Sequence, residues 1–529
     1  MPPRFRVSHL FIIVIVISGS LYLFTDTSSS RASSASGGSS ASHASTVLAF
    51  CPHSTKHSHT PTVILQADAS HAPLSNRTFW LGDNPGQIPP NFAPYAYPPR
   101  DLRFAQRLPQ TNTKPFEDDP NGSQVCQVHN VPSSPPPPVP KDWLPSKVMF
   151  GMSTTPDRVL YNLPVWAHWL PSSKRALDPA SVEARGLPMV VILTPPPSVT
   201  EVMRTREAVD EAQARGMHVV MRAKESDRFE TRYFALAEEM WLEAQRRERE
   251  EAVVTEWFVF SDDDTFFPDF DSLVRMLSAF GPESDTIVGA LSESTKQVAQ
   301  WGHIAYGGAG IYVSRALMAK MNAPGVWNDC LGRFGAAFGG DAMVSHCAAL
   351  ALAKDIKETL TIEDTIHQLD IRGDGTGWFQ SGFLITSLHH WGSWFTLFPP
   401  WHESGAGDLR KGIGLVGKAA KGVTGDNWGR RYVFEEGKVV VNLGYSVVIH
   451  AKPVTKAELG ASEHTWWEFE TFHPVRPGIE EAVGKRTYYL TNVRPMEPGV
   501  VKLEHKNREG ERVDVVWDGR ATGRGKGWW

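Results

Sequence analysis

The stretch Trp257-Phe258-Val259-Phe260-Ser261-Asp262-Asp263-Asp264-Thr265 decides the fold of this protein. An apolar, β-prone run ends abruptly in three adjacent carboxylates, which is the pattern of a buried strand with an acidic tip. Three neighbouring negative charges repel one another, so a fold keeps them together when a positive group lies against them. At the carboxyl end of a buried strand, that group is commonly a divalent metal holding a phosphorylated ligand, and oxygen ligands favour Mn²⁺ or Mg²⁺. The alternative is a solvated turn whose aspartates cap a helix.

The acidic run belongs to a series of alternating strands and helices. Apolar runs predict strands, and 3.6-residue spacing predicts helices between them. Strands are expected at 148–152, 189–193, 218–221, 257–260 and 286–291, and helices at 199–215, 230–250 and 270–280. This alternation predicts an α/β sheet that binds its ligands at the carboxyl ends of the strands.

Three later segments add candidate site residues. Tyr306-Gly307-Gly308-Ala309-Gly310 precedes a short strand, and glycines at such a point let a backbone approach a ligand closely. Asp341 opens a helix that reaches about Leu352, where it is either an N-cap or a general base aimed into a cleft. The segment 384–391 is expected to be a strand that carries His389 and His390 as candidate metal ligands.

Composition excludes several functional classes. The chain has 529 residues and a formal net charge of -5, with no long basic stretch, which argues against a nucleic-acid partner. It has neither a P-loop nor a G-x-G-x-x-G fingerprint, so nucleoside triphosphatase and dinucleotide-binding functions lose their main support. Cys330 and Cys347 are either a disulfide pair or two buried thiols.

The N-terminal residues predict membrane attachment. Arg4 and Arg6 precede the apolar run 10–24. With Val7 and Ser8 the membrane-compatible stretch reaches about 18 residues, which is near the short limit for a spanning helix. The positive flank predicts a cytosolic tail at 1–9 and a lumenal chain, with a cleaved signal peptide as the alternative. Residues 25–146 are rich in Ser and then Pro, which predicts an extended lumenal stem with sequons at Asn76 and Asn121. The predicted protein is a single-pass type II Golgi membrane protein.

Beyond residue 400 the sequence predicts a β-rich C-terminal region. Strand-like runs lie at 438–441 and 445–450, followed by the pair Trp466-Trp467. The expected organisation is therefore a domain at 147–400 and an accessory region at 401–529.

The ordered set of motifs resembles a known family. The segments WFVFSDDDTFF, YGGAGIYVSRAL, GGDAMVSHC and HQLDIRGDGTGWFQ…SLHHW follow an anchor and a stem. In this order they resemble the Fringe-like glycosyltransferases of glycosyltransferase family 31, with similarity closest to a fungal and plant branch. The resemblance covers about residues 147–400, roughly half of the chain.

The resemblance implies a GT-A fold, which is a Rossmann-like nucleotide-sugar-binding sheet with flanking helices. It also implies an inverting hexosyl transfer from a UDP-sugar to a hydroxyl of a glycan or glycoprotein, with a β-1,3-type linkage and Mn²⁺ or Mg²⁺. By similarity, Asp264 and His389 are metal ligands, and Asp341 is the catalytic base. Residues implied to meet the nucleotide are Asp262, which also borders the metal, together with Asp263, Ser153, Thr154, Arg158 and Gly308.

Two other functional classes remain open at this point. One is a catalytically inactive sugar-binding protein. The other is a phosphatase of the haloacid dehalogenase type, which also places acids after a strand. Its Asp-x-Asp-x-Thr/Val pattern is not met, because Phe266 stands at the fifth position.

Overall fold

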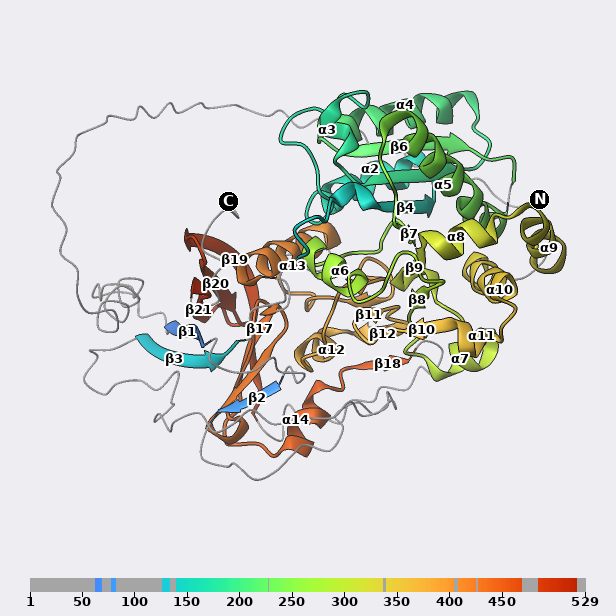
Figure 1. The fold of residues 1–529 in the computed structure, drawn as a ribbon. Helices are drawn as coiled ribbons and strands as arrows, with labels where there is room; N and C mark the ends of the chain where they lie inside the picture. Colours follow the sequence, from blue (N-terminus) through green and yellow to red (C-terminus); the bar gives the residue numbers. More distant parts are fainter. Residues whose placement is uncertain are drawn as a thin grey trace, which may run out of the picture. The chain divides into compact units, whose positions relative to one another are not determined.

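A seven-stranded mixed sheet carries the acidic run. Its strand order is β10-β8-β9-β7-β4-β5-β6, and β9 runs antiparallel to both of its neighbours while the other pairings are parallel (Figure 1). The strands are β4 (Val148–Ser153), β5 (Met189–Thr194), β6 (His218–Ala223), β7 (Trp257–Phe260), β8 (Ile287–Gly289), β9 (Ile311–Ser314) and β10 (Leu360–Ile362). This sheet confirms the predicted α/β fold class.

The computed structural model describes residues 62–68, 78–81, 126–133, 139–226, 228–335, 339–403, 408–424, 427–468 and 484–520. The predicted cytosolic tail, the anchor at 10–24 and both sequons lie outside these residues. Among the described helices, none has the length and apolar character needed to cross a membrane.

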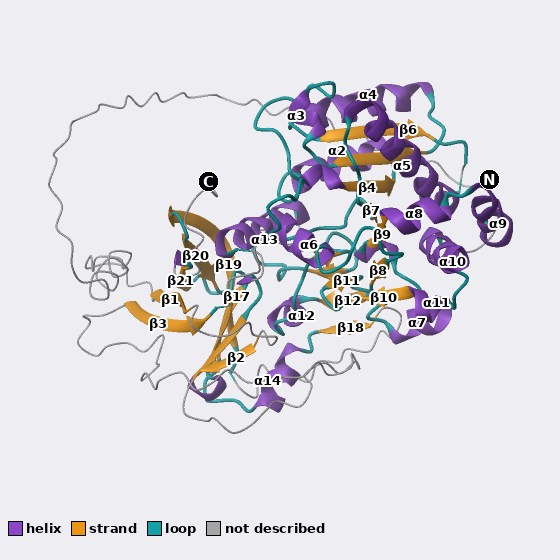
Figure 2. Cartoon of the chain, in the orientation of Figure 1, coloured by secondary structure: helices purple, strands orange, loops and turns teal. Residues whose placement is uncertain are grey.

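Side chains on both faces of the seven-stranded sheet are buried. Figure 2 shows the helices that lie beside this sheet. Successive residues of β4 alternate between two cores: Phe150 joins the core that contains α2 and α4, and Met149 joins the core that contains α5 and α10. Gly151 lets α5 approach, because an added Cβ there would lie 2.6 Å from Sδ of Met240. The helices are α2 (Pro156–Trp166), α3 (Val182–Arg185), α4 (Val199–Ala214), α5 (Phe229–Glu251), α6 (Phe270–Leu277), α7 (Thr295–Trp301), α8 (Arg315–Met321), α9 (Pro324–Phe334), α10 (Gly340–Leu352), α11 (Ile356–Thr359) and α12 (Thr376–Gln380).

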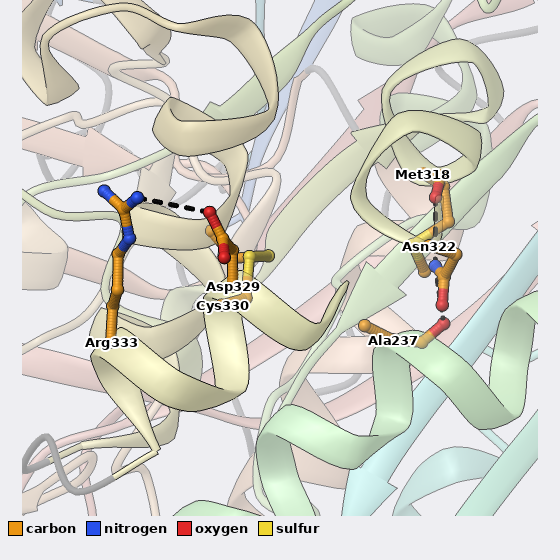
Figure 3. The surroundings of a disulfide bond; sticks show 7 residues. Ala237, Met318, Asn322, Asp329, Cys330 and Arg333 are labelled. Atoms are coloured by element: carbon orange, nitrogen blue, oxygen red, sulfur yellow. Dashed lines mark hydrogen bonds and ion pairs between the residues drawn. A yellow bond between two sulfur atoms is a disulfide. The ribbon is translucent and has the colours of Figure 1, made fainter. Parts of the chain in front are cut away.

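A disulfide joins α9 to α10. Cys330 and Cys347 are both fully buried and their Cα atoms lie 5.3 Å apart (Figure 3). Near the bond, Asn322 at the end of α8 donates hydrogen bonds to the carbonyls of Ala237 in α5 and Met318 in α8, at 3.2 and 2.9 Å. The disulfide holds α10, whose first turn carries Asp341, against α9, and the Asn322 hydrogen bonds tie the end of α8 to α5.

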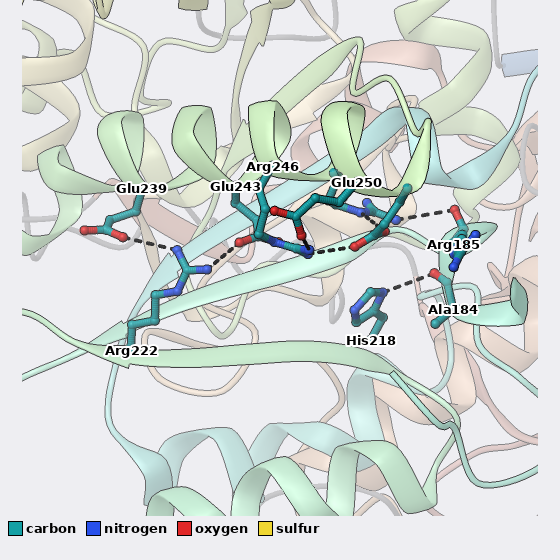
Figure 4. A network of polar contacts seen from close by, with 10 residues as sticks. Ala184, Arg185, His218, Arg222, Glu239, Glu243, Arg246 and Glu250 are labelled. Atoms are coloured by element: carbon teal, nitrogen blue, oxygen red, sulfur yellow. Dashed lines mark hydrogen bonds and ion pairs between the residues drawn. The ribbon is translucent and has the colours of Figure 1, made fainter. Parts of the chain in front are cut away.

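An ionic network around the buried Glu243 anchors α5 to β6 (Figure 4). Arg222 of β6 pairs with Glu239 and with Glu243, and Glu243 also pairs with Arg246 at 2.6 Å. The side chain of Glu243 is 2% exposed, so its charge depends on these two guanidinium partners. Removing one of them is expected to cost more than breaking a surface ion pair.

The C-terminal region forms a nine-stranded sheet that also includes strands from the predicted stem. Its order is β2-β15-β16-β17-β19-β20-β21-β1-β3. The strands are β1 (Thr62–Asp68), β2 (Thr78–Leu81), β3 (Cys126–Pro132), β15 (Arg431–Phe434), β16 (Val439–Asn442), β17 (Ser446–Ile449), β19 (Arg486–Glu497), β20 (Val500–Lys506) and β21 (Arg512–Asp518). The sequence predicts a stem over 25–146, but Val63, Ile64 and Leu65 are fully buried in this sheet. The Pro-rich composition of the wider segment hides a short apolar run that pairs in parallel with β21.

One helix lies between the elements of the two sheets, and one strand from the C-terminal region joins a separate three-stranded sheet of order β14-β12-β18. The helix α13 (Leu409–Val423) contacts α2 on one side and β19 and β20 on the other. The strand β18 (Trp466–Glu468) pairs with β12 (Ile371–Asp374) and not with the large sheet. The predicted boundary at residue 400 therefore lies between segments that pack against each other, because α13 and β18 follow it and contact α2 and β12, which precede it. The remaining elements are β11 (Ile366–His367), β13 (Ser387–Leu388), β14 (Phe395–Thr396) and α14 (Lys456–Glu463).

Candidate active site

The topology of the seven-stranded sheet places the candidate site. The chain leaves β4 toward β5 on one side, while β7 lies against β4 on the other side. At such a switch point the two following loops diverge and leave a crevice at the carboxyl ends of the strands. The segments 153–158 and 261–264 follow β4 and β7 at this edge and contact each other through Arg158 and Asp263, so the residues predicted from two distant parts of the sequence come together.

Asp263 is buried and holds its neighbours in place. Its carboxylate accepts hydrogen bonds from the hydroxyl of Thr154 and from Nε of Arg158 at 2.6 Å, and its backbone carbonyl accepts from Nε1 of Trp166 at 3.0 Å. The Arg158 side chain remains 59% exposed. The negative charge of Asp263 is therefore paired with Arg158 and fixes the orientation of the guanidinium group, which stays accessible to solvent. The nearby hydroxyl of Ser153 is buried and bonds to no described residue.

Asp262 and Asp264 turn toward His389. Oδ1 of Asp264 lies 3.0 Å from Nε2 of His389, and Oδ2 of Asp262 lies 3.3 Å from the same nitrogen. Burial favours a higher pKa for Asp264, but the charge and hydrogen bond of His389 outweigh burial and hold this pKa below its usual range. Burial favours a lower pKa for His389, but the two carboxylates raise it to about 10.

These side chains suit a divalent cation. Ligand atoms from Asp264, His389 and His390 lie within 4.8 Å of one another. Carboxylate oxygen and imidazole nitrogen are suitable donors for Mn²⁺. A proton on His389 and a cation between the side chains are alternative ways to neutralise the two carboxylates. The sequence analysis selects His389 over His390, whereas the geometry brings both rings to the site.

The glycine loop shapes the wall behind His389. An added Cβ at Gly308 would lie 2.0 Å from Nδ1 of His389, so the ring packs directly on this backbone. Thr265 ties the loop to the acidic run, because its hydroxyl donates to the Gly308 carbonyl at 2.9 Å. The sequence analysis assigns Gly308 to nucleotide binding, and in the structure its lack of a side chain accommodates the histidine ring.

Asp341 lies at the first turn of α10, close to this loop. Its carboxylate accepts hydrogen bonds from the N–H of Ala342 at 2.8 Å and from the N–H of Gly307 at 3.3 Å. Burial raises its pKa to about 6, although the backbone N–H groups oppose the shift, and the charge of Asp262 adds to it. A carboxylate with this pKa is suited to accept a proton near neutral pH.

Two residues near the site, Tyr233 and Asp370, are not among the site residues predicted from the sequence. Tyr233 is buried beside Asp341, since an added Cβ at Gly307 would lie 2.5 Å from the tyrosine hydroxyl and 3.2 Å from Cβ of Asp341. Asp370 contacts His390 and is buried. Tyr233 gave no signal, because it fits the apolar face of α5, whereas Asp370 stands in the quoted motif HQLDIRGDG.

The expected strand over 384–391 is wrong for most of its length. Only Ser387–Leu388 forms a strand, and His390 adopts a left-handed backbone conformation with φ 56°. The apolar run Leu384–Leu388 suggested a longer strand, but the chain must turn at His390 to bring its ring beside His389. The two ring centroids lie 3.6 Å apart.

Comparison with known families supports the interpretation of this region. A family model described as Fringe-like matches residues 208–370, and one described as a protein of unknown function, DUF604, matches residues 297–495. The first match includes the acidic run and Asp341, and the second includes Asp341 and both histidines. These matches support a Fringe-like glycosyltransferase. No curated protein matches the sequence.

Among solved structures, three glycosyltransferases match the chain at low similarity. The mannosyltransferase PcManGT from Pyrobaculum calidifontis, in complex with GDP-Man and Mn²⁺, is 11% identical with a TM-score of 0.25, over 42% of this chain and 58% of that one. Mouse xyloside xylosyltransferase 1 in its apo form is 10% identical with a TM-score of 0.27, over 46% and 96%. A glycosyltransferase involved in glycosylation of the major capsid of PBCV-1 is 11% identical with a TM-score of 0.25, over 46% and 92%.

Proposed function

We propose that this protein is an inverting glycosyltransferase that moves a sugar from a UDP-sugar to a hydroxyl group of a glycan or glycoprotein. The observation that carries the proposal is the pairing of two features at one edge of the sheet. One is the Asp264–His389 cluster, and the other is the separate carboxylate of Asp341 with a pKa of about 6. A cation-binding cluster beside a carboxylate base is the minimum machinery for a single displacement. The UDP group and the β-1,3-type linkage rest on the family resemblance.

In the proposed mechanism the acidic run serves the leaving group. Asp264, His389 and Asp262 would hold Mn²⁺ or Mg²⁺, and the cation would supply positive charge to neutralise the diphosphate of the leaving group. Arg158, oriented by Asp263, lies at the crevice mouth, where it adds a second positive charge toward the nucleotide. Ser153 has a free buried hydroxyl at the same edge and completes this surface.

Asp341 acts on the acceptor. Its carboxylate takes the proton from the acceptor hydroxyl as the oxygen attacks the anomeric carbon on the face opposite to the leaving UDP. The new bond to the acceptor forms as the bond to the diphosphate breaks, so the configuration inverts. The two backbone N–H groups hold the carboxylate in one orientation before the substrate arrives.

Release of UDP from a panel of UDP-sugars, with and without candidate glycan acceptors, tests this proposal. We expect acceptor-stimulated release that depends on Mn²⁺ or Mg²⁺ and disappears in Asp264→Asn. Binding of UDP-sugars without any transfer would instead identify an inactive sugar-binding protein.

Asp355→Asn is a suitable control for the metal variant. Asp355 is an exposed N-cap of α11 that accepts from the Lys357 N–H at 2.9 Å, and it contacts none of the residues of the site described above. Normal turnover and normal Mn²⁺ binding by Asp264→Asn would refute the assigned metal site.

We also propose that the apolar segment 10–24 anchors the protein in the Golgi membrane with residues 147–529 in the lumen. The support is the positive flank of this segment and its length. On intact microsomes the folded region should resist added protease, and glycosidase should lower the mass if Asn76 or Asn121 is modified. Complete digestion on sealed vesicles would contradict this orientation.

A further inference from the structure

The two successive histidines of the site require an unusual backbone. In a strand, neighbouring side chains point to opposite faces, so only one of two adjacent histidines can face a ligand. Here the strand ends at Leu388, and His390 takes φ 56°. This left-handed conformation is uncommon for a residue with a side chain, and such residues cluster at functional sites. It folds the His390 ring back beside His389.

The His390 ring is held from several sides. Trp394 stacks on it with ring centroids 3.5 Å apart and an interplanar angle of 13°. The guanidinium of Arg372 lies over the ring of Trp394 at 5.5 Å. The backbone N–H of Ser393 donates to the His390 carbonyl at 3.1 Å, which closes the turn. The ring therefore has one defined orientation.

A buried carboxylate meets the edge of this ring. Oδ1 of Asp370 lies 3.4 Å from Nε2 of His390, which is longer than an ordinary hydrogen bond, and this buried nitrogen has no hydrogen-bond partner among the described residues. Oδ2 of Asp370 accepts a hydrogen bond from the hydroxyl of Ser292. The hydroxyl oxygen of Ser292 in turn accepts from the N–H of Ser294 at 3.0 Å. Asp370 is thus fixed on one side and faces the imidazole on the other.

We propose that His390 is a further protein ligand of the cation site, beside Asp264, His389 and Asp262, and that Asp370 and Ser292 position it. This inference rests on the proposed function, because it concerns the cation of that site. With the cation bound, Asp370 would accept the Nε2 proton of His390 across this gap, which would leave the lone pair on Nδ1 for the cation. A carboxylate that accepts from the second nitrogen of a metal-bound histidine is a recurrent arrangement that fixes the tautomer and the ring orientation.

Metal binding by the purified full-length protein tests the inference without any substrate. Mn²⁺ affinity is measured by calorimetry, and the visible spectrum of the Co²⁺-loaded protein reports the nitrogen ligands. We expect Asp370→Asn to weaken Mn²⁺ binding by roughly 10- to 100-fold, the usual effect of losing such a partner. His390→Asn tolerates the left-handed backbone and should change the Co²⁺ spectrum.

The matched control is Asp518→Asn. Asp518 is also a buried aspartate, with a side chain 3% exposed, but it pairs with Arg520 in the nine-stranded sheet. The control should keep the wild-type affinity and spectrum, and its melting temperature calibrates the loss of a buried carboxylate. If the wild type binds Mn²⁺ and both His390→Asn and Asp370→Asn leave affinity and spectrum unchanged, this inference is wrong and the proposed function stands. If the wild type binds no divalent cation, the metal site of the proposed function fails as well.

Discussion

Replacing Asp341 by asparagine separates a catalytic role from a structural one. The substitution keeps the shape of the side chain and one of its two oxygens, so it keeps the hydrogen bond from the Ala342 N–H to Oδ1 or the one from the Gly307 N–H to Oδ2, but not both. It removes the negative charge and the ability to take a proton. The N-cap of α10 is Gly339, so the N-cap role that the sequence left open for Asp341 is wrong. If Asp341 only accepts hydrogen bonds from backbone N–H groups near the first turn of α10, the variant should lose little activity.

The stability of this variant is expected to depend on pH in a defined way. Burial raises the folded-state pKa of Asp341 from 3.8 to about 6. Between these two values the folded protein binds more protons than the unfolded chain, so wild-type stability falls as the pH rises through this window. One pKa unit corresponds to about 1.4 kcal/mol, so ionising this carboxyl at neutral pH opposes folding by on the order of 3 kcal/mol. The asparagine variant lacks this penalty and should be at least as stable as the wild type at neutral pH.

The activity of the variant should fall, although its stability at neutral pH is unchanged or higher. Loss of a general base lowers the rate by roughly 10²- to 10⁴-fold, so kcat for transfer should fall by at least about a hundredfold. For the wild type, kcat/KM should decline as the pH falls below about 6, where Asp341 becomes protonated. UDP release measures the rate, and urea denaturation at several pH values measures the stability.

Two outcomes would refute the reasoning for Asp341. Near-normal turnover by Asp341→Asn would show that the residue has a structural role and is not the general base. A wild-type stability that does not fall between about pH 4 and pH 6 relative to the variant would show that the carboxyl is not held in an unfavourable environment. Asp355→Asn serves as the control for the loss of an N-cap carboxylate without a site role.

Three further predictions concern the supports of the site. Gly308→Ala places a Cβ 2.0 Å from Nδ1 of His389 and should weaken Mn²⁺ binding at least roughly tenfold, whereas Gly325→Ala meets nothing within 4 Å and should have no effect in the same titration. Replacing both Cys330 and its partner by serine removes a link across 17 residues and should lower the unfolding free energy by about 3 kcal/mol in urea, and an unchanged midpoint would contradict this. A chain that ends at residue 400 loses the strand that pairs with β12, so it should be largely insoluble or melt without cooperativity, and a soluble, active fragment would contradict the integrated fold.

Local patterns predicted the seven-stranded sheet well because its strands are short apolar runs with clear ends. In β4 and β7 every residue is buried, and this all-apolar pattern is typical of strands covered on both faces. The acidic run and Asp341 could be found from the sequence because they stand where these elements end or begin. The residues that their side chains contact depend on which strands are neighbours in the sheet, and the local sequence does not give that order.

The sequence could not show the contacts that join distant segments. The pairing of Asp370 with His390 depends on a left-handed residue, and no local propensity predicts a positive φ at a histidine beside a tryptophan. The strand β1 is a seven-residue run within a long Pro-rich segment, and its partner β21 lies near the other end of the chain. Both features are decided by tertiary packing, which overrides the local pattern.

The nine-stranded sheet also constrains the order in which the protein can be completed during synthesis. Thr62 of β1 pairs with Asp514 of β21, so an early segment must wait for the last strand to leave the ribosome. The segment after Asp370 likewise depends on a residue that is made much later. The hydroxyl of Thr465 donates to the Asp374 carbonyl at 2.5 Å and accepts from the Gly377 N–H at 2.9 Å. Pairings of such long separation form slowly and leave strand edges open meanwhile. Nascent chains of this protein should therefore depend on chaperones until β21 is made, and premature termination should yield aggregation and not a smaller working enzyme.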